Sequence, residues 1–168
     1  MSEISKNAAQ EIVSTFKANS IVPSSTKPDD ISDKYDIRNL IIEHYEDNHF
    51  EIWSEDWGTD NDAGEDYEGL LRLFSKRSGN KMIFEGLKSE TDGDDVVVSF
   101  VFNGKPHKWE IGQYSDHLSE DFLEYFEMLQ VESQDGTFIS LDGGDMPEFA
   151  FVPNDVYEVL AKHDVIRH

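Results

Sequence analysis

Apolar residues recur at every third or fourth position in five stretches of the chain, and this spacing is typical of helices that bury one face. In the first stretch, Ile12 and Phe16 fall on one stripe, and in the second, His44 falls on the apolar face. The predicted helices cover 3–19, 33–47, 66–78, 119–131 and a final segment from Asn154 through Leu160. The residues expected to cap the second, fourth and fifth helices are Ser32, Ser119 and Asn154.

The middle of the chain changes to strand-like patterns of apolar and β-branched residues. Asn103-Gly104 separates two of these runs, and an Asn-Gly pair in that place is the strongest local signal for a β-hairpin. The predicted strands cover 81–90, 95–102, 105–112, 137–142 and 148–152. Strands that are grouped together, with helices before and after, predict an α+β fold of one domain around an antiparallel β-meander.

Residues 20–30 contain two prolines and three serines, a composition typical of a linker. The predicted organisation is therefore an N-terminal helix and linker over residues 1–30, followed by an α+β domain over residues 31–168.

The formal net charge is −22, and the excess of acidic residues is confined to two segments of the chain. Between Arg38 and Arg72 there are eleven acids and no Lys or Arg, and between Lys108 and Lys162 there are thirteen acids and again no Lys or Arg. Such a field repels nucleic acids and anionic membranes and attracts cationic partners. Plain solubility and adaptation to high salt are the alternative interpretations of the charge.

The sequence contains none of the spacings expected for common catalytic or metal sites. EF-hand frames that start at Asp56 or Asp60 place the wrong residues at the ligand positions. Zinc patterns, a Gly-x-Ser-x-Gly elbow and phosphate-binding glycine loops are also missing from the sequence. We therefore predict no catalytic residue, no dedicated metal site and no cofactor. The chain lacks cysteine, a membrane-length apolar run and a secretory signal layout, which favours a cytoplasmic protein.

The densest acidic stretch, residues 51–68, also holds large aromatic residues. Carboxylates accept charge-assisted hydrogen bonds from Lys and Arg, and rigid aromatic side chains anchor many protein interfaces. The residues of this loop that are predicted to bind a partner are Trp53, Glu55, Asp56, Trp57, Asp60, Asp62, Glu65, Asp66 and Tyr67. A second predicted surface is the exposed face of helix 119–131, with Glu120, Asp121 and Glu124. The competing interpretation is that the tryptophans belong to the core and that the acids only solvate a loop.

Residues 139–160, "ISLDGGDMPEFAFVPNDVYEVL", are similar to the strand–Gly-Gly-Asp–strand segment of the SMI1/KNR4-like superfamily. The small, cysteine-free and acidic chain also resembles the bacterial immunity proteins that neutralise toxins of contact-dependent growth inhibition and related competition systems. These resemblances imply an inhibitor that occludes a basic toxin domain, for example a nuclease. The alternatives are a DNA-mimicking antirestriction protein, a small carboxylate-dependent enzyme, and an adaptor for a neutral partner.

Overall fold

The protein is described here by a computed structural model, in which the apolar pattern of the middle of the chain becomes a three-stranded sheet. The residues that the structure describes are 3–51, 63–114, 118–133, 135–141 and 148–166. Strands β2 (Glu85–Asp92), β3 (Asp95–Phe102) and β4 (Lys105–Gly112) are antiparallel neighbours in this order. Asn103 and Gly104 join β3 to β4 with φ values of 52° and 77°, the left-handed backbone that an Asn-Gly turn requires. The predicted meander is confirmed.

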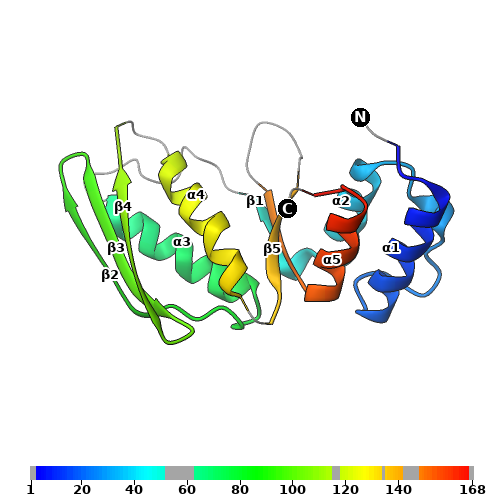
Figure 1. Cartoon of the computed structure of the whole chain (residues 1–168), viewed down its shortest axis with the longest axis horizontal. Coiled ribbons are helices and arrows are strands. Elements are labelled where there is room, and N and C mark those ends of the chain that lie inside the picture. Colours follow the sequence, from blue (N-terminus) through cyan, green and yellow to red (C-terminus); the bar gives the residue numbers. More distant parts are fainter. Residues whose placement is uncertain (1–2, 52–62, 115–117, 134, 142–147, 167–168) are drawn as a thin grey trace. The chain divides into compact units, whose positions relative to one another are not determined.

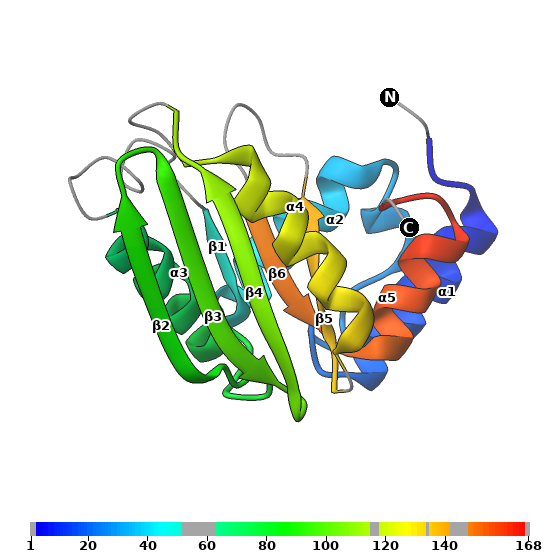
Figure 2. The ribbon, with the colours of Figure 1, turned by 60° about the vertical axis from the view of Figure 1, so that its left-hand side comes forward.

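One face of this sheet is buried beneath two helices. Alternate residues of β3 point toward them and are buried: Val96, Val98, Phe100 and Phe102. Helices α3 (Ala63–Arg77) and α4 (Glu120–Leu129) pack on this face, before and after the meander in the chain (Figure 1; Figure 2). Ring stacking joins the two helices, since the ring centroids of Phe74 and Phe126 are 3.7 Å apart, and joins α4 to the sheet, since those of Trp109 and Tyr125 are 5.4 Å apart.

A second three-stranded sheet forms from both ends of the chain. Its order is β1 (His49–Glu51), β6 (Glu148–Val152) and β5 (Thr137–Leu141), with antiparallel neighbours. The sequence pattern predicted β5 and β6 but not β1, which is only three residues long. The helices of this part are α1 (Lys6–Ala18), α2 (Lys34–His44) and α5 (Asn154–Lys162). Helices and antiparallel strands together confirm the α+β class.

The chain divides into two compact units, and the second is inserted into the first along the sequence. The first unit consists of Met1–Glu51 and Asp135–His168, and the second of Ile52–Gln134. Residues 1–30 contribute to the core of the first unit: Ile21 and Val22, within the predicted linker, are buried with Ile12 and Phe16. The segment therefore packs on other parts of the first unit, including Ile139 and Val152 of its sheet.

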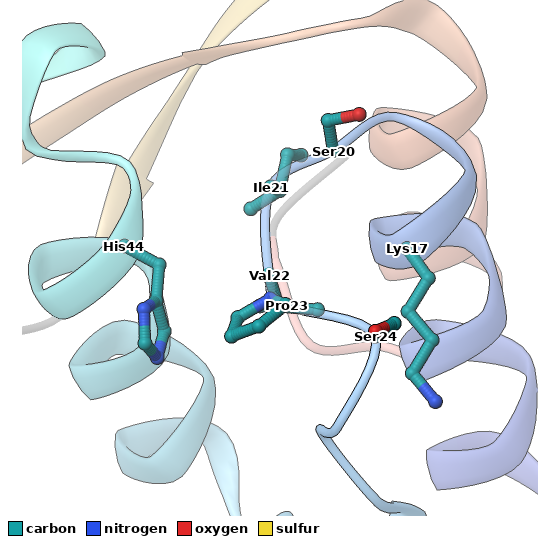
Figure 3. A pocket seen from close by; sticks show the side chains of 7 residues that line it. All are labelled: Lys17, Ser20, Ile21, Val22, Pro23, Ser24 and His44. Carbon is teal, nitrogen blue, oxygen red and sulfur yellow. The ribbon is translucent and has the colours of Figure 1, made fainter.

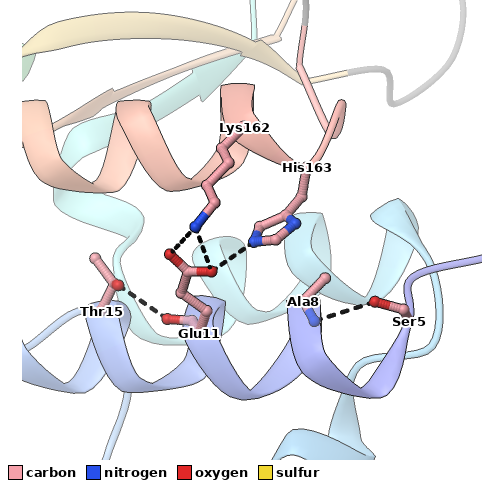
Figure 4. Close-up of polar contacts among 6 residues, drawn as sticks. All are labelled: Ser5, Ala8, Glu11, Thr15, Lys162 and His163. Carbon is pink, nitrogen blue, oxygen red and sulfur yellow. Dashed lines mark hydrogen bonds and ion pairs between the residues drawn. The ribbon is translucent and has the colours of Figure 1, made fainter.

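Helix α1 is also tied to α5 by polar contacts at the surface (Figure 4). The carboxylate of Glu11 accepts hydrogen bonds from Lys162 Nζ at 2.9 and 3.1 Å, and lies 2.8 Å from His163 Nε2. These bonds hold the pKa of Glu11 below its ordinary value. The first and last helices of the chain are therefore neighbours within the first unit.

Among the described residues of the first unit, the buried carboxylate is that of Glu148 at the start of β6. Arg38 on α2 donates to it from Nε at 2.8 Å and from Nη2 at 2.6 Å, and His49 Nε2 lies 3.3 Å away. Burial raises the pKa of Glu148, but the bonds from Arg38 and His49 outweigh it and hold the pKa below its ordinary value. The carboxylate is therefore charged and paired at neutral pH.

Three details of the predicted helices are corrected. Asp33, rather than Ser32, caps α2 by accepting from the backbone N–H groups of Tyr35 and Asp36. Asn154 is the first residue of α5, and Pro153 occupies the N-cap position in its place. His44 is exposed at the end of α2 rather than packed on its apolar face. The cap at Ser119 is confirmed, since its hydroxyl accepts from the Asp121 N–H.

Among the helices of the described residues, none combines the length and the apolar character that crossing a membrane demands.

Candidate protein-binding surface

The first turns of α3 and α4 meet at one end of the second unit, and Tyr67 joins them. Its hydroxyl accepts a hydrogen bond of 2.9 Å from the backbone N–H of Ser119, at the start of α4. The same hydroxyl donates to Oε1 of Gln113, which follows β4. The tyrosine thus links both helices to the end of the sheet.

The turn between β2 and β3 lies at the same end. The N–H of Gly64, in the first turn of α3, donates to Thr91 Oγ1 at 2.9 Å. The N–H of Gln113 donates to the carbonyl of Asp94 at 2.7 Å. Four segments that are distant in the sequence are therefore held together: the starts of α3 and α4, the β2–β3 turn and the end of β4.

These segments gather carboxylates, and we call their set the acidic end. Its members are Glu65, Asp66, Asp92, Asp94, Asp95, Glu120 and Asp121. All are exposed except Asp66, which is half-buried, and residues 63–71, 89–95, 109–114 and 118–126 contain no Lys or Arg. Acids in the first turns of α3 and α4 are favoured by the positive ends of the helix dipoles. Bases lie at the opposite end of α3, where Lys76 and Arg77 occupy its last turn.

Tyr67 itself is part of the core and not an anchor for a partner. Its side chain is fully buried and stacks on Phe122 with ring centroids 4.8 Å apart. Burial raises the pKa of Tyr67 to about 12, the Ser119 N–H lowers it, and the carboxylates of Asp66 and Asp121 raise it further. The predicted contact between Tyr67 and a partner is therefore wrong, because the neutral phenol is a structural link inside the unit.

The other predicted binding residues that the structure describes are brought close together. Asp121 is fixed in place, because its Oδ2 accepts from the Gly112 N–H at 2.9 Å. Glu65 and Glu120 are exposed in the first turns of their helices, and Glu124 is exposed one turn further along α4. The remaining predicted residues lie outside the described residues: Trp53, Glu55, Asp56, Trp57, Asp60 and Asp62.

The structure also reveals exposed apolar side chains that the sequence pattern missed. Tyr114, Met128 and Val131 are 82%, 69% and 88% exposed. Met128 follows Glu124 by four residues on α4, so the two side chains are neighbours, and Val131 lies just beyond α4 in the short 3-10 helix η4 (Gln130–Glu132). We call Tyr114, Glu124, Glu127, Met128 and Val131 the α4 surface.

Tyr114 is connected to both surfaces through Gly112. A Cβ atom at Gly112 would lie 2.5 Å from the ring of Tyr114, so the glycine makes room for the ring. The N–H of Gly112 is the group that Asp121 accepts from. The exposed ring therefore lies against Gly112, whose backbone is bonded to Asp121 at the start of α4.

A hollow of the first unit lies elsewhere. It measures about 380 Å³ and is lined by Lys17, Ser20, Ile21, Val22, Pro23, Ser24 and His44. Figure 3 shows the loop from Ser20 to Ser24 between Lys17 on α1 and His44 on α2. Both basic residues lie in the last turns of their helices, where they complement the negative ends of the helix dipoles. Their presence thus has a structural reason, and the acidic end remains the candidate site.

Comparison of the chain with family models, with curated proteins and with solved structures finds no match. The resemblances to immunity proteins and to the SMI1/KNR4-like segment stay predictions, and residues 142–147 of that segment lie outside the described residues.

Proposed function

We propose that the protein is an immunity or inhibitor protein that binds a basic toxin domain in the cytoplasm and occludes it without catalysis. The observation that carries the proposal is the adjacency of exposed carboxylates and exposed apolar groups in the second unit. Glu124 lies one turn from Met128 on α4, and Asp121 accepts from the N–H of Gly112, against which the ring of Tyr114 lies. Neither feature alone would distinguish a binding surface from a solvated helix.

The two kinds of group contribute to different steps of binding. Carboxylates accept charge-assisted hydrogen bonds from Lys and Arg, and their field accelerates the encounter with a cationic partner. Exposed apolar side chains that become buried at the centre of an interface slow its dissociation. A nuclease is the class of toxin that fits this chemistry best, because its active surface must be cationic to bind phosphates.

The first experiment identifies the partner. The protein is used as bait in its native cell, and the captured proteins are identified by mass spectrometry. We expect a basic domain from a secreted toxin, whose activity is lost when the purified protein is added. A DNA mimic would instead capture several unrelated DNA-binding proteins. An acidic partner, or a toxin that stays active in the complex, would contradict the proposal.

The second experiment tests the surface with the purified partner by stopped-flow kinetics. Glu120→Lys combined with Glu124→Lys should slow association by about tenfold or more, because it reverses the local field. The matched control is Glu43→Lys with Glu158→Lys, which changes the net charge equally at two exposed residues of the first unit. Tyr114→Ala and Met128→Ala should instead accelerate dissociation. Equal effects of the two charge-reversal pairs would remove α4 from the interface.

The predicted acidic loop is tested in the same assay. Asp60→Lys and Asp62→Lys should slow association, and Trp57→Ala should shorten the lifetime of the complex. If all three variants bind like the wild type while the α4 variants do not, the interface consists of α4 and the acidic end alone.

A further inference from the structure

The second unit has one sheet face that its helices do not occupy. Helices α3 and α4 pack on the face that carries Val98 and Trp109. On each strand, the residues that alternate with the buried ones point to the opposite face. The strand register places the outward residues in rows across the three strands. One row is Glu90, Val97 and Glu110, and the next is Lys88, Ser99 and Lys108. We call these six residues the banded face.

The banded face separates its charges by sign and keeps its centre neutral. The two glutamates and the two lysines are all exposed, and they lie on the outer strands β2 and β4. The central strand contributes only half-buried Val97 and Ser99, with Val101 one row further. From strand geometry, the like charges of one row are about 10 Å apart and the two rows are about 7 Å apart.

This pattern is complementary to itself in one orientation. Consider a two-fold axis that is parallel to the sheet, perpendicular to the strands and placed between the two rows. Rotation about this axis places a second copy face to face with the first and reverses its strand direction. Each row then faces the other row of the second copy, so Glu90 lies opposite Lys88 of the second copy. On β4, Glu110 likewise lies opposite Lys108 of the second copy. Isologous pairing of one patch with itself is the usual basis of homodimers.

We propose that the banded face associates with the banded face of a second copy of this chain. The reciprocal ion pairs surround Val97 and Ser99 of both copies, which meet across the axis. Because α3 and α4 lie on the other side of the sheet, such a dimer leaves Glu124, Glu127 and Met128 on α4 of each copy accessible. The six residues of the banded face belong neither to the acidic end nor to the α4 surface, so the inference does not depend on the proposed function.

Two charge effects oppose the dimer and define its expected strength. Both copies are acidic, but repulsion between charges more than about 8 Å apart is screened at physiological ionic strength. At the margin, the same rotation brings Asp92 of one copy opposite Glu85 of the other, both exposed. The association is therefore a concentration-dependent equilibrium, and Glu85→Lys should strengthen it by replacing a repulsive pair with an attractive one.

The test is sedimentation equilibrium of the full chain over a concentration series, with circular dichroism to verify folding. The wild type should show a monomer–dimer equilibrium. Lys88→Glu with Lys108→Glu should leave only monomer, because every facing pair becomes acidic. The matched control is Lys76→Glu with Lys81→Glu, which changes the net charge equally at exposed residues near the end of α3 and should retain the dimer.

A charge swap separates the pattern from the net charge. Adding Glu90→Lys and Glu110→Lys to the two lysine reversals restores the original net charge and the complementarity, so the dimer should return. A wild type that is monomeric at every concentration overturns the proposal. So does a control pair that is as damaging as the test pair, or a swap that does not restore association. If the reversed variants do not fold, failure of Glu85→Lys to strengthen the dimer overturns the proposal as well.

Discussion

At the scale of single residues, the buried and paired carboxylate of Glu148 contributes to the stability of the first unit. A buried carboxylate is tolerated only when partners compensate for its lost hydration, and Arg38 and His49 do so here. Removing one of these side chains leaves a buried charge without its partner. The resulting loss of stability is larger than the net contribution of the intact network. The three residues come from α2, β1 and β6, so the network also fixes the helix against the sheet.

Glu148→Gln should lower the free energy of unfolding by about 3 kcal/mol at pH 7, because Arg38 would keep a charge without its counter-ion. The pKa of Glu148 is lowered in the folded state, so its stabilising effect is present above the unfolded pKa, about 4.3. That effect is lost as the pH falls through the folded pKa. Urea denaturation of both proteins should therefore show a difference at pH 7 that narrows toward pH 3.

Glu158→Gln is the control, since Glu158 is exposed on α5 and its substitution should change stability little. A difference between Glu148→Gln and the wild type that stays constant with pH would show that the side chain acts through packing and not through its charge.

Tyr67 illustrates what a sequence can and cannot assign for one residue. Its helical spacing with Leu70, Leu71 and Phe74 was compatible with a core position, and all four are fully buried. The neighbouring acids favoured a surface interpretation instead. The deciding contacts, with Gln113 and Ser119, join residues about fifty positions apart, and local composition contains no signal for them.

Among elements, the start of α3 is placed by a glycine. A Cβ atom at Gly64 would lie 2.6 Å from Ser89 Oγ and 2.8 Å from Thr91 Oγ1, both on β2. Such distances are shorter than van der Waals contact, so only a residue without a side chain allows the helix to approach the strand this closely. The position of Glu65 and Asp66 in the acidic end depends on this approach.

Gly64→Ala should therefore destabilise the protein by about 1–3 kcal/mol, the usual cost of overpacking, despite the higher helix propensity of alanine. Thermal unfolding or urea denaturation measures the change. Glu65→Ala, one exposed position further, is the matched control and should shift stability by less than about 0.5 kcal/mol. A stabilised Gly64→Ala variant would mean that the start of α3 can move away from β2 without loss.

Local signals explain which elements could be predicted. The hairpin at Asn103-Gly104 and the cap at Ser119 depend on neighbouring residues, and both were found from sequence. Strand β1 pairs with β6, whose residues follow almost one hundred positions later, as in Phe50 with Phe149. A three-residue strand defined by so distant a partner has no periodicity that could reveal it.

For the whole molecule, the second unit is one continuous segment with its own core. Its fully buried side chains include Tyr67, Phe74, Phe102, Phe122 and Phe126. It also carries the acidic end, the α4 surface and the banded face. Both proposed interactions are therefore located in one contiguous part of the sequence.

A fragment of residues 52–134 should fold without the rest of the chain, because domains of this size can bury a sufficient core. Circular dichroism and dispersed amide signals in a proton–nitrogen NMR spectrum test its folding. The fragment should retain binding to the basic partner. An unfolded fragment would show that the second unit depends on the first for its stability.

The insertion of one unit into the other also determines the order in which a newly made chain can become native. Strand β1 leaves the ribosome about one hundred residues before its partner β6. Until then the apolar faces of α1 and α2 have no sheet to cover, and they are exposed to chaperones and proteases. The middle segment can complete its own structure during this interval, so a ribosome that stalls late would release a finished meander attached to an unfinished amino-terminal half.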